Sequence, residues 1–245
     1  SCKMNLKPQI IRYGERAILL QWDFKIASEN LQFILSIKKY LCDFYIKRQV
    51  YINNTYNSLL VVYGRSIDCI YDDLSYLKSL DFSTIKLLRS SGNFYRIPVC
   101  YDLKFGLDLE FLATQKSMEV NEIINLHTAA DYTLYFMGFL PGFLYLGGMP
   151  ETLAYPRKKH PRKSILKGAV GIAENQTGIY PTSSPAGWQI IGNSPVNLFD
   201  KNKTKPSPFE AGDRIKFYEI TLKEHQLITN DIAQGAFQLK PETDV

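Results

Sequence analysis

The strongest constraint on the fold is the uneven distribution of glycine and proline along the chain. Most of the 15 glycines and nearly all of the 12 prolines lie in residues 92–245. There, short apolar runs alternate with turn residues, as in Ala169–Ala173, Trp188–Ile191 and Arg214–Tyr218. Short strands tolerate such frequent breaks, whereas long helices do not. The sequence therefore predicts a mainly-β barrel or sandwich here, with one clear helix over about residues 117–130.

The first 91 residues instead alternate strand and helix signals. Apolar runs of strand length occupy residues 17–22, 50–52, 58–63 and 85–88. Helical spacing of apolar residues follows Ser28, and a second helix is expected to start at Ser66. This β-α-β-β-α-β order predicts a ferredoxin-like α+β domain. The junction is placed at Ser90-Ser91-Gly92-Asn93, which gives domains 1–91 and 92–245.

Composition excludes several classes of function. The formal net charge of +5 comes from 29 basic and 24 acidic residues that are well mixed, without a dense basic tract, so nucleic acid is not an expected partner. No apolar run reaches the roughly 18 to 20 residues that span a bilayer. With no secretion signal and four widely spaced cysteines, we expect a cytoplasmic protein without a membrane association and with reduced thiols.

The common catalytic and cofactor motifs are absent. The chain has no glycine-rich phosphate loop of the G-x-x-x-x-G-K-[ST] type, no G-x-G-x-x-G and no G-x-S-x-G. Its three histidines are not within helical ligand spacing of one another, so no metal site is expected. If the protein handles ATP, it does so by an arrangement that these motifs do not describe.

A glycine- and aromatic-rich segment, Tyr135–Gly148, is the first candidate for a binding site. Gly138, Phe139, Pro141 and Gly142 form its centre. Glycine permits positive φ and proline fixes a turn, so this loop could present backbone N–H groups to an anion or a carbonyl. The alternative is a tight barrel corner in which the aromatic rings fill the core.

Two arginines that each follow a proline, Arg157 and Arg162, form the second candidate. The arginine fork matches carboxylates and phosphates, and a neighbouring proline lowers the entropy lost when a loop is ordered. We expect these arginines to bind a carboxylate or to stabilise developing negative charge. The alternative is a solvated basic loop.

Further candidates supply neutral hydrogen-bonding groups. Gln176, Thr177 and Tyr180 suit an amide or lactam ring. Trp188 is interpreted either as a core residue or as a pocket wall. His127 lies on the apolar face of the predicted helix, where a histidine is often a core residue, but it could also carry a proton beside the glycine-rich loop.

These segments together resemble the KipI / allophanate hydrolase subunit 1 family. The resemblance lies in Tyr95–Asp102, Phe105–Glu110, His127, Tyr135–Gly148, Pro156-Arg157, Pro161-Arg162, Gly168–Ala173, Gln176–Pro181, Pro185–Trp188, Leu198–Asp200 and Ala211–Asp213. It implies a cyclophilin-like β-barrel of the carboxyltransferase C/D type for the second domain and a separate α+β first domain. Leu166, Ala186 and Asn193 depart from the usual family pattern, which bears on substrate identity more than on fold.

The resemblance also implies a function. Such members look like the B-type subunit of an ATP-dependent 5-oxoprolinase, which opens 5-oxo-L-proline to L-glutamate. The implied partners are a KipA-type subunit and a LamB/YcsF-type subunit of the same enzyme, with ATP acting at the level of the complex and no metal or biotin evident in this chain. The chain alone is then expected to be inactive. Two alternatives stay open, an inhibitor of a sensor histidine kinase and a carboxyltransferase-like subunit of a urea or allophanate pathway.

Overall fold

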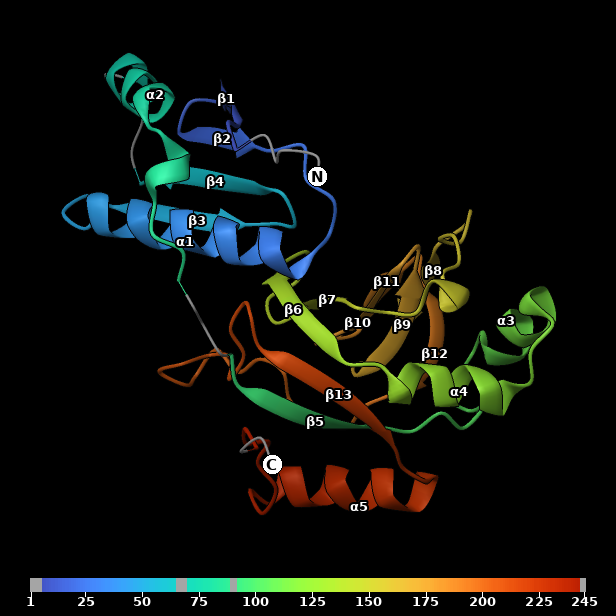
Figure 1. The fold of residues 1–245 in the computed structure, drawn as a ribbon. Coiled ribbons are helices and arrows are strands. Elements are labelled where there is room, and N and C mark those ends of the chain that lie inside the picture. The colour runs from blue at the N-terminus through green and yellow to red at the C-terminus, as the bar shows by residue number, and fades with distance from the viewer. Residues whose placement is uncertain (1–5, 65–69, 89–91, 243–245) are drawn as a thin grey trace. The chain divides into compact units, whose positions relative to one another are not determined.

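The computed structural model describes residues 6–64, 70–88 and 92–242. The chain divides into two compact units, residues 1–90 and 91–245, which are taken separately below (Figure 1). The buried apolar cluster of the first unit draws only on residues before the division. The two buried clusters of the second unit draw only on residues after it.

The first unit is a four-stranded antiparallel sheet with helices. The sheet order is β1 (Gln9–Arg12), β2 (Ala17–Gln21), β4 (Ser58–Tyr63) and β3 (Val50–Asn54). The helical elements are α1 (Ser28–Phe44), α2 (Ile70–Ser79) and the short 3-10 turn η1 (Phe82–Thr84). Apolar residues at alternate positions of β2 and β4 pack against the apolar stripe of α1, which forms the core of the unit.

The fourth strand expected for a ferredoxin-like domain is not where the sequence suggested. Residues 85–88 have no regular structure, and the edge beside β2 is occupied by β1 from the N-terminal side. The predicted helix start at Ser66 lies outside the described residues. β2, α1 and β3 follow one another along the chain, and β4 lies between β2 and β3 in the sheet. The full ferredoxin-like arrangement is not confirmed.

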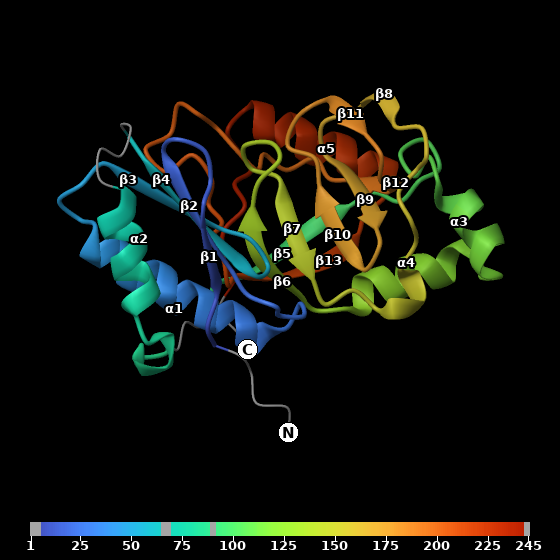
Figure 2. The same cartoon turned by 90° about the horizontal axis from the view of Figure 1, so that it is seen from above.

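The second unit is built on a seven-stranded sheet that curls into a half-barrel (Figures 1 and 2). Its order is β12 (Gln189–Asn193), β9 (Ala169–Ala173), β10 (Gln176–Ile179), β7 (Leu144–Gly147), β6 (Tyr132–Met137), β13 (Arg214–Glu219) and β5 (Phe94–Val99). A separate hairpin joins β8 (Arg162–Ile165) and β11 (Ser184–Ala186). The curl brings the two edge strands together, because Cys100 and Asn193 exchange backbone hydrogen bonds of 2.8 and 2.9 Å.

This unit has more helix than predicted. The predicted helix over 117–130 corresponds to α4 (Val120–Ala129). Two further helices, α3 (Leu109–Lys116) and α5 (Leu222–Ala233), and a 3-10 turn, η2 (Glu151–Leu153), were not expected. The expectation of a single clear helix was therefore wrong.

Alternate residues of the central strands face two different apolar clusters. Leu144 and Leu146 of β7 point into the large core with α3 and α4. Phe143, just before β7, and Tyr145 point to the opposite face, where a smaller aromatic cluster lies. The period of two along a strand separates these two sets. Every candidate residue on these strands thus belongs to one face or the other.

Candidate functional site

The smaller cluster is a group of interlocked aromatic rings on the face of β7, β9 and β10 away from the main core. Phe143 and Tyr180 meet edge to face with ring centroids 4.9 Å apart, and Trp188 lies 5.3 Å from Phe143. Tyr145 lies 6.0 Å from Trp188 at the partly exposed rim. We call this group of four residues the aromatic face. Such edge-to-face contacts fix ring orientations, so the group is rigid, and Phe143, Tyr180 and Trp188 are buried within it.

Two glycines make room for these rings. Gly171 of β9 and Gly178 of β10 are direct cross-strand partners. A Cβ on Gly171 would lie 3.1 Å from the Cβ of Trp188, and one on Gly178 would lie 3.0 Å from a ring carbon of Phe143. Trp188 and Phe143 therefore occupy the space that a side chain at position 171 or 178 would need. Gly171 and Gly178 thus serve the aromatic face.

Arg157 lies over this face. Its guanidinium carbon is 5.9 Å from the centre of the Trp188 ring, within the range of a cation–π interaction. The residue is exposed, and among the described residues no carboxylate lies within salt-bridge distance of it. The fork of Arg157 is thus held in place by an aromatic ring while its donors are open to an anion.

Two phenols lie in the field of Arg157. Burial raises the pKa of Tyr180 to about 12, and the charge of Arg157 partly opposes this rise. Burial also raises the pKa of Tyr145, again opposed by Arg157. Both phenols therefore keep their protons at neutral pH and can donate hydrogen bonds. Gln176, at the start of β10, is half-buried and lies on the same side of the sheet as Gly178.

The glycine-rich loop closes one end of the aromatic face. Phe139 has φ of +61°, a conformation that is costly for a bulky residue, and Gly142 has φ of +84°. The Phe139 side chain is 65% exposed, and its ring meets Phe143 edge to face at 5.8 Å. Gly138 is half-buried and Pro141 is exposed in the same turn. In the described structure the amides of Phe139 and Gly142 have no protein acceptor, so the loop can present N–H groups, as the sequence suggested.

Arg162 has a different role from Arg157. Its two terminal nitrogens donate to the two carboxylate oxygens of Asp108 at 2.8 and 2.7 Å. Lys158 donates to the same carboxylate at 2.8 Å, and so does the backbone N–H of Ile190 at 2.7 Å. The Asp108 side chain is only 4% exposed. Burial alone would raise the pKa of Asp108, but the hydrogen bonds from Arg162 and Lys158 outweigh it and lower that pKa. The fork of Arg162 is already occupied, so the geometry does not support a role for it in binding substrate.

His127 lies inside the main core, on the other side of the sheet. Thr177 donates to the carbonyl of Gly171 at 3.0 Å, so its oxygen accepts from Nε2 of His127 at 2.9 Å. Nδ1 of His127 then accepts from the Tyr101 hydroxyl at 2.7 Å. Both ring nitrogens are used and the residue is fully buried, which lowers its pKa to about 3. The polar groups of His127 and Thr177 are thus hydrogen-bonded to other groups of the buried core.

The structure thus brings together only some of the predicted residues. Tyr180 and Trp188 belong to the aromatic face, and Arg157 lies over it, while Gly138, Phe139, Pro141 and Gly142 form the loop at one end. Gln176 faces the same side of the sheet from the other end of β10, where its neighbour Thr177 pairs with Leu146. Sequence reasoning missed Tyr145, although its alternation with Leu144 and Leu146 was visible, and it missed Asp108. Among the described residues no group of three or more His, Cys, Asp or Glu could hold a metal ion. None of the described helices combines the length and hydropathy needed to cross a membrane.

Comparison with known proteins places this chain in a family. The family model for the carboxyltransferase domain, subdomain C and D, matches residues 8–209. Because this match covers most of the chain, the chain belongs to that family. The match extends across both compact units, so the family relationship is not confined to the half-barrel.

Individual relatives agree with this assignment. The B-type subunit of the 5-oxoprolinase of Bacillus subtilis is 48% identical over 129 residues, which are 53% of this chain and 54% of the relative. The chain thus spans about half the length of this curated relative. A conserved uncharacterized protein from Pyrococcus horikoshii is 37% identical, with a TM-score of 0.53 over 89% of this chain and 100% of that one. The urea amidolyase of K. lactis has a TM-score of 0.79 over 98% of this chain and 16% of that one, but at 18% identity this shows the fold alone.

Proposed function

We propose that this chain is a subunit of an ATP-dependent 5-oxoprolinase, which opens 5-oxo-L-proline to L-glutamate. The observation that carries the proposal is the 48% identity to the B-type subunit of a 5-oxoprolinase. Its proposed partners are the KipA-type and LamB/YcsF-type subunits of that enzyme. The proposal includes a cytoplasmic location and a cyclophilin-like type for the half-barrel.

The substrate would bind on the aromatic face. 5-Oxo-L-proline is a small, flat lactam with one carboxylate and one ring amide. Arg157 would hold the carboxylate with its open guanidinium, and Tyr145, the partly exposed member of the aromatic face, would pack against the ring. The N–H groups of the glycine-rich loop would bind the lactam oxygen. These groups would orient the amide for attack and keep it away from bulk water.

The aromatic face does not fit ATP itself. It offers one open guanidinium, which matches a single carboxylate, whereas a triphosphate carries several negative charges. No step of the reaction is therefore assigned to a nucleotide on this chain, and ATP use is placed with the complex. Arg162 and His127, which we predicted to be catalytic, are not included in the proposed site because their polar groups are already occupied.

A carboxyltransferase-like subunit is the second candidate, and the matching family model favours it. Such a subunit would act on a biotinylated carrier rather than on a free lactam. It would need a carrier protein with a biotin-bearing lysine, so dependence on such a carrier distinguishes the two functions. No described contact favours the third possibility, an inhibitor of a sensor histidine kinase.

Reconstitution tests the proposal. The chain, purified alone and together with its partner subunits, is supplied with ATP and 5-oxo-L-proline, and L-glutamate is measured. We expect glutamate only from the complete complex, because the described chain lacks a nucleotide site of known type. Robust turnover by the chain alone would contradict the assignment of ATP to the complex. A reconstituted complex that is inactive on 5-oxoproline, but that carboxylates a substrate with a biotinylated carrier, would favour the second candidate.

A further inference from the structure

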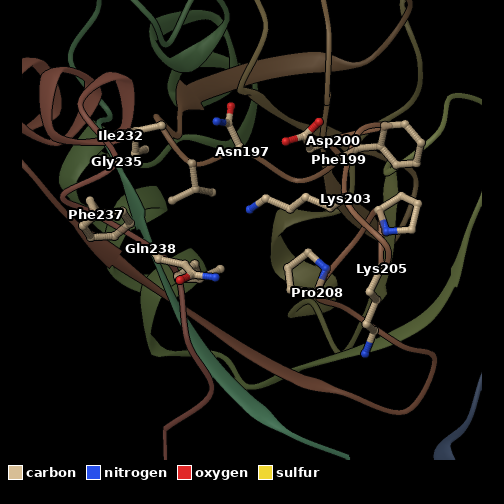
Figure 3. A pocket seen from close by; sticks show the side chains of 13 residues that line it. Asn197, Phe199, Asp200, Lys203, Lys205, Pro208, Ile232, Gly235, Phe237 and Gln238 are labelled. Atoms are coloured by element: carbon tan, nitrogen blue, oxygen red, sulfur yellow. The ribbon is translucent and has the colours of Figure 1, made fainter.

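A cavity lies in the half-barrel unit, and none of the residues that line it belongs to the aromatic face. It has a volume of about 510 Å³ and is lined on one side by the loop 196–208 and on the other by the segment that follows α5. That volume is within the range of small-molecule sites. Figure 3 shows Lys203 reaching into the cavity from the loop, opposite Phe237 and Gln238.

Both walls are held in place by backbone hydrogen bonds. The loop is closed at its base by the N–H of Asp200, which donates to Pro206 at 2.7 Å, and the N–H of Lys203 donates to Asp200 at 3.2 Å. On the other wall, Gly235 has φ of +73° and ends α5, so that Phe237 turns back and donates to Asp231 at 3.2 Å. The cavity is thus preformed, which lowers the entropic cost of binding a ligand.

The charges that line the cavity are of opposite sign. Lys203, Lys205 and Asp200 line it, and the ammonium of Lys205 is paired with Glu210 at 2.7 Å. In the part of the chain that the structure describes, Lys203 and Asp200 form no ion pair with each other or with another residue, and Oδ1 of Asp200 accepts one hydrogen bond, from the N–H of Asn202 at 3.0 Å. The amides of Asn197 and Gln238 add neutral donors, and the Asn197 oxygen is already used by Lys167. A polyphosphate would be repelled by Asp200, and a purely cationic ligand by Lys203. A small molecule that carries both an ammonium and a carboxylate satisfies both charges.

We propose that this cavity binds a free amino acid, with the carboxylate on Lys203, the ammonium on Asp200, and the side chain against Ile232 and Phe237. This inference concerns a site separate from the aromatic face. Only the choice of L-glutamate as first probe rests on the proposed function, because L-glutamate is the product of that reaction. Binding of L-glutamate in the cavity would make the complex sensitive to the concentration of its product.

The loop offers a matched pair of variants. Lys201 is two residues from Lys203 and carries the same charge, but it is exposed and does not line the cavity. Lys203→Met and Lys201→Met therefore remove the same charge from the same loop, but only Lys203→Met removes it from the cavity.

The test is calorimetric titration of the full chain with L-glutamate, L-leucine and glutarate, a dicarboxylate that lacks the ammonium group. We expect binding of at least one of the two amino acids and none of glutarate. Affinity should fall about tenfold or more in Lys203→Met, as for loss of a charge-assisted hydrogen bond, and stay unchanged in Lys201→Met. Binding of L-leucine but not of L-glutamate would support the site and remove the link to the product.

Three outcomes would overturn the proposal: an equal loss of affinity in both lysine variants, glutarate affinity equal to that of L-glutamate, or no binding of either amino acid at about 10 mM. An inactive complex would overturn the proposed function and leave this result unaffected.

Discussion

At the scale of single residues, the two Pro-Arg pairs look alike in sequence and differ in the structure. Arg157 lies over Trp188 with its donors open, whereas Arg162 holds the buried carboxylate of Asp108. The pairing with Asp108 joins positions 54 residues apart, so no local pattern could have revealed it. What the sequence does predict is the type of chemistry, a fork that binds a carboxylate. For Arg162 that carboxylate belongs to the protein.

Substitution of these arginines separates binding from folding. Arg157→Ala in the reconstituted complex should lower turnover roughly 30- to 1000-fold, which corresponds to about 2 to 4 kcal/mol of lost transition-state stabilisation. Its free energy of unfolding should stay the same, because the residue is exposed. Arg157→Lys should recover only part of the activity, since it keeps the charge and loses the fork.

Arg162→Ala is the matched control. It leaves Asp108 buried with Lys158 and one backbone N–H, so the free energy of unfolding should fall by about 3 kcal/mol, near the lower end for breaking a buried pair. Urea unfolding of both variants measures this difference. If Arg157→Ala has full activity and normal stability, the proposed substrate site is wrong.

The buried His127 makes stability depend on pH. Its pKa in the folded chain is about 3, below the ordinary value of 6.5, so between these values the unfolded chain binds a proton that the folded chain does not. The contribution of His127 is therefore complete above pH 6.5 and is lost as the pH falls toward 3, by up to about 1.4 kcal/mol per pH unit.

Unfolding curves across this range test that dependence. His127→Gln should be less stable at pH 7, because it disturbs the hydrogen bonds to Tyr101 and Thr177. The free energy of unfolding of this variant should also fall less steeply between about pH 6.5 and 4.5 than that of the unmodified chain. Equal slopes for the two proteins would mean that His127 is not buried in its neutral form.

At the scale of elements, the second unit was predicted in its parts but not in its connections. The strands near 94–99, 169–173 and 214–218 follow from short apolar runs between turn residues. The parallel pairing of β5 with β13 joins distant parts of the chain, which a local pattern cannot indicate. α5 was missed, although the sequence carries a signal for it in Thr221 and Glu224, which form a capping box at its start. In the first unit, the short apolar run at 85–88 was predicted to be a strand, but it has no regular structure. A run this short does not by itself distinguish a strand from an irregular segment.

Glycine substitutions test how the hairpin of β9 and β10 carries the aromatic face. In Gly178→Ala the new Cβ would lie 2.6 Å from the backbone oxygen of Leu144 and 3.0 Å from Phe143, so β7 and the ring must both shift. We expect a loss of about 1 to 3 kcal/mol in the free energy of unfolding, as for an overpacked core. Gly138→Ala is the control, because its Cβ would meet nothing closer than 3.5 Å and its φ is not positive. Thermal unfolding of the two variants measures the difference in stability. Equal stability of Gly178→Ala and Gly138→Ala would show that the packing of the rings does not require glycine at position 178.

At the scale of the whole molecule, the two compact units have separate cores. The buried cluster of the first unit draws on residues 6–85, and the clusters of the second draw on residues 95–239. The aromatic face and the cavity of Figure 3 both lie within the second unit. The family model matches residues 8–209, so the family's domain includes residues of both units although each unit has a separate core.

This separation predicts that residues 92–245 fold when expressed alone. Each apolar cluster of the second unit keeps all its members in that fragment, so it should show one cooperative thermal transition and, in calorimetry, the same amino-acid affinity as the full chain. The starting point matters, because the N–H of Asn93 donates to the buried carboxylate of Asp213 at 2.9 Å and its carbonyl accepts from Arg214 at 2.8 Å. A fragment that starts at Phe94 lacks both bonds and should be about 1 to 3 kcal/mol less stable, since Asp213 loses a donor. A fragment 92–245 that stays unfolded while the full chain folds would show that the half-barrel depends on the first unit.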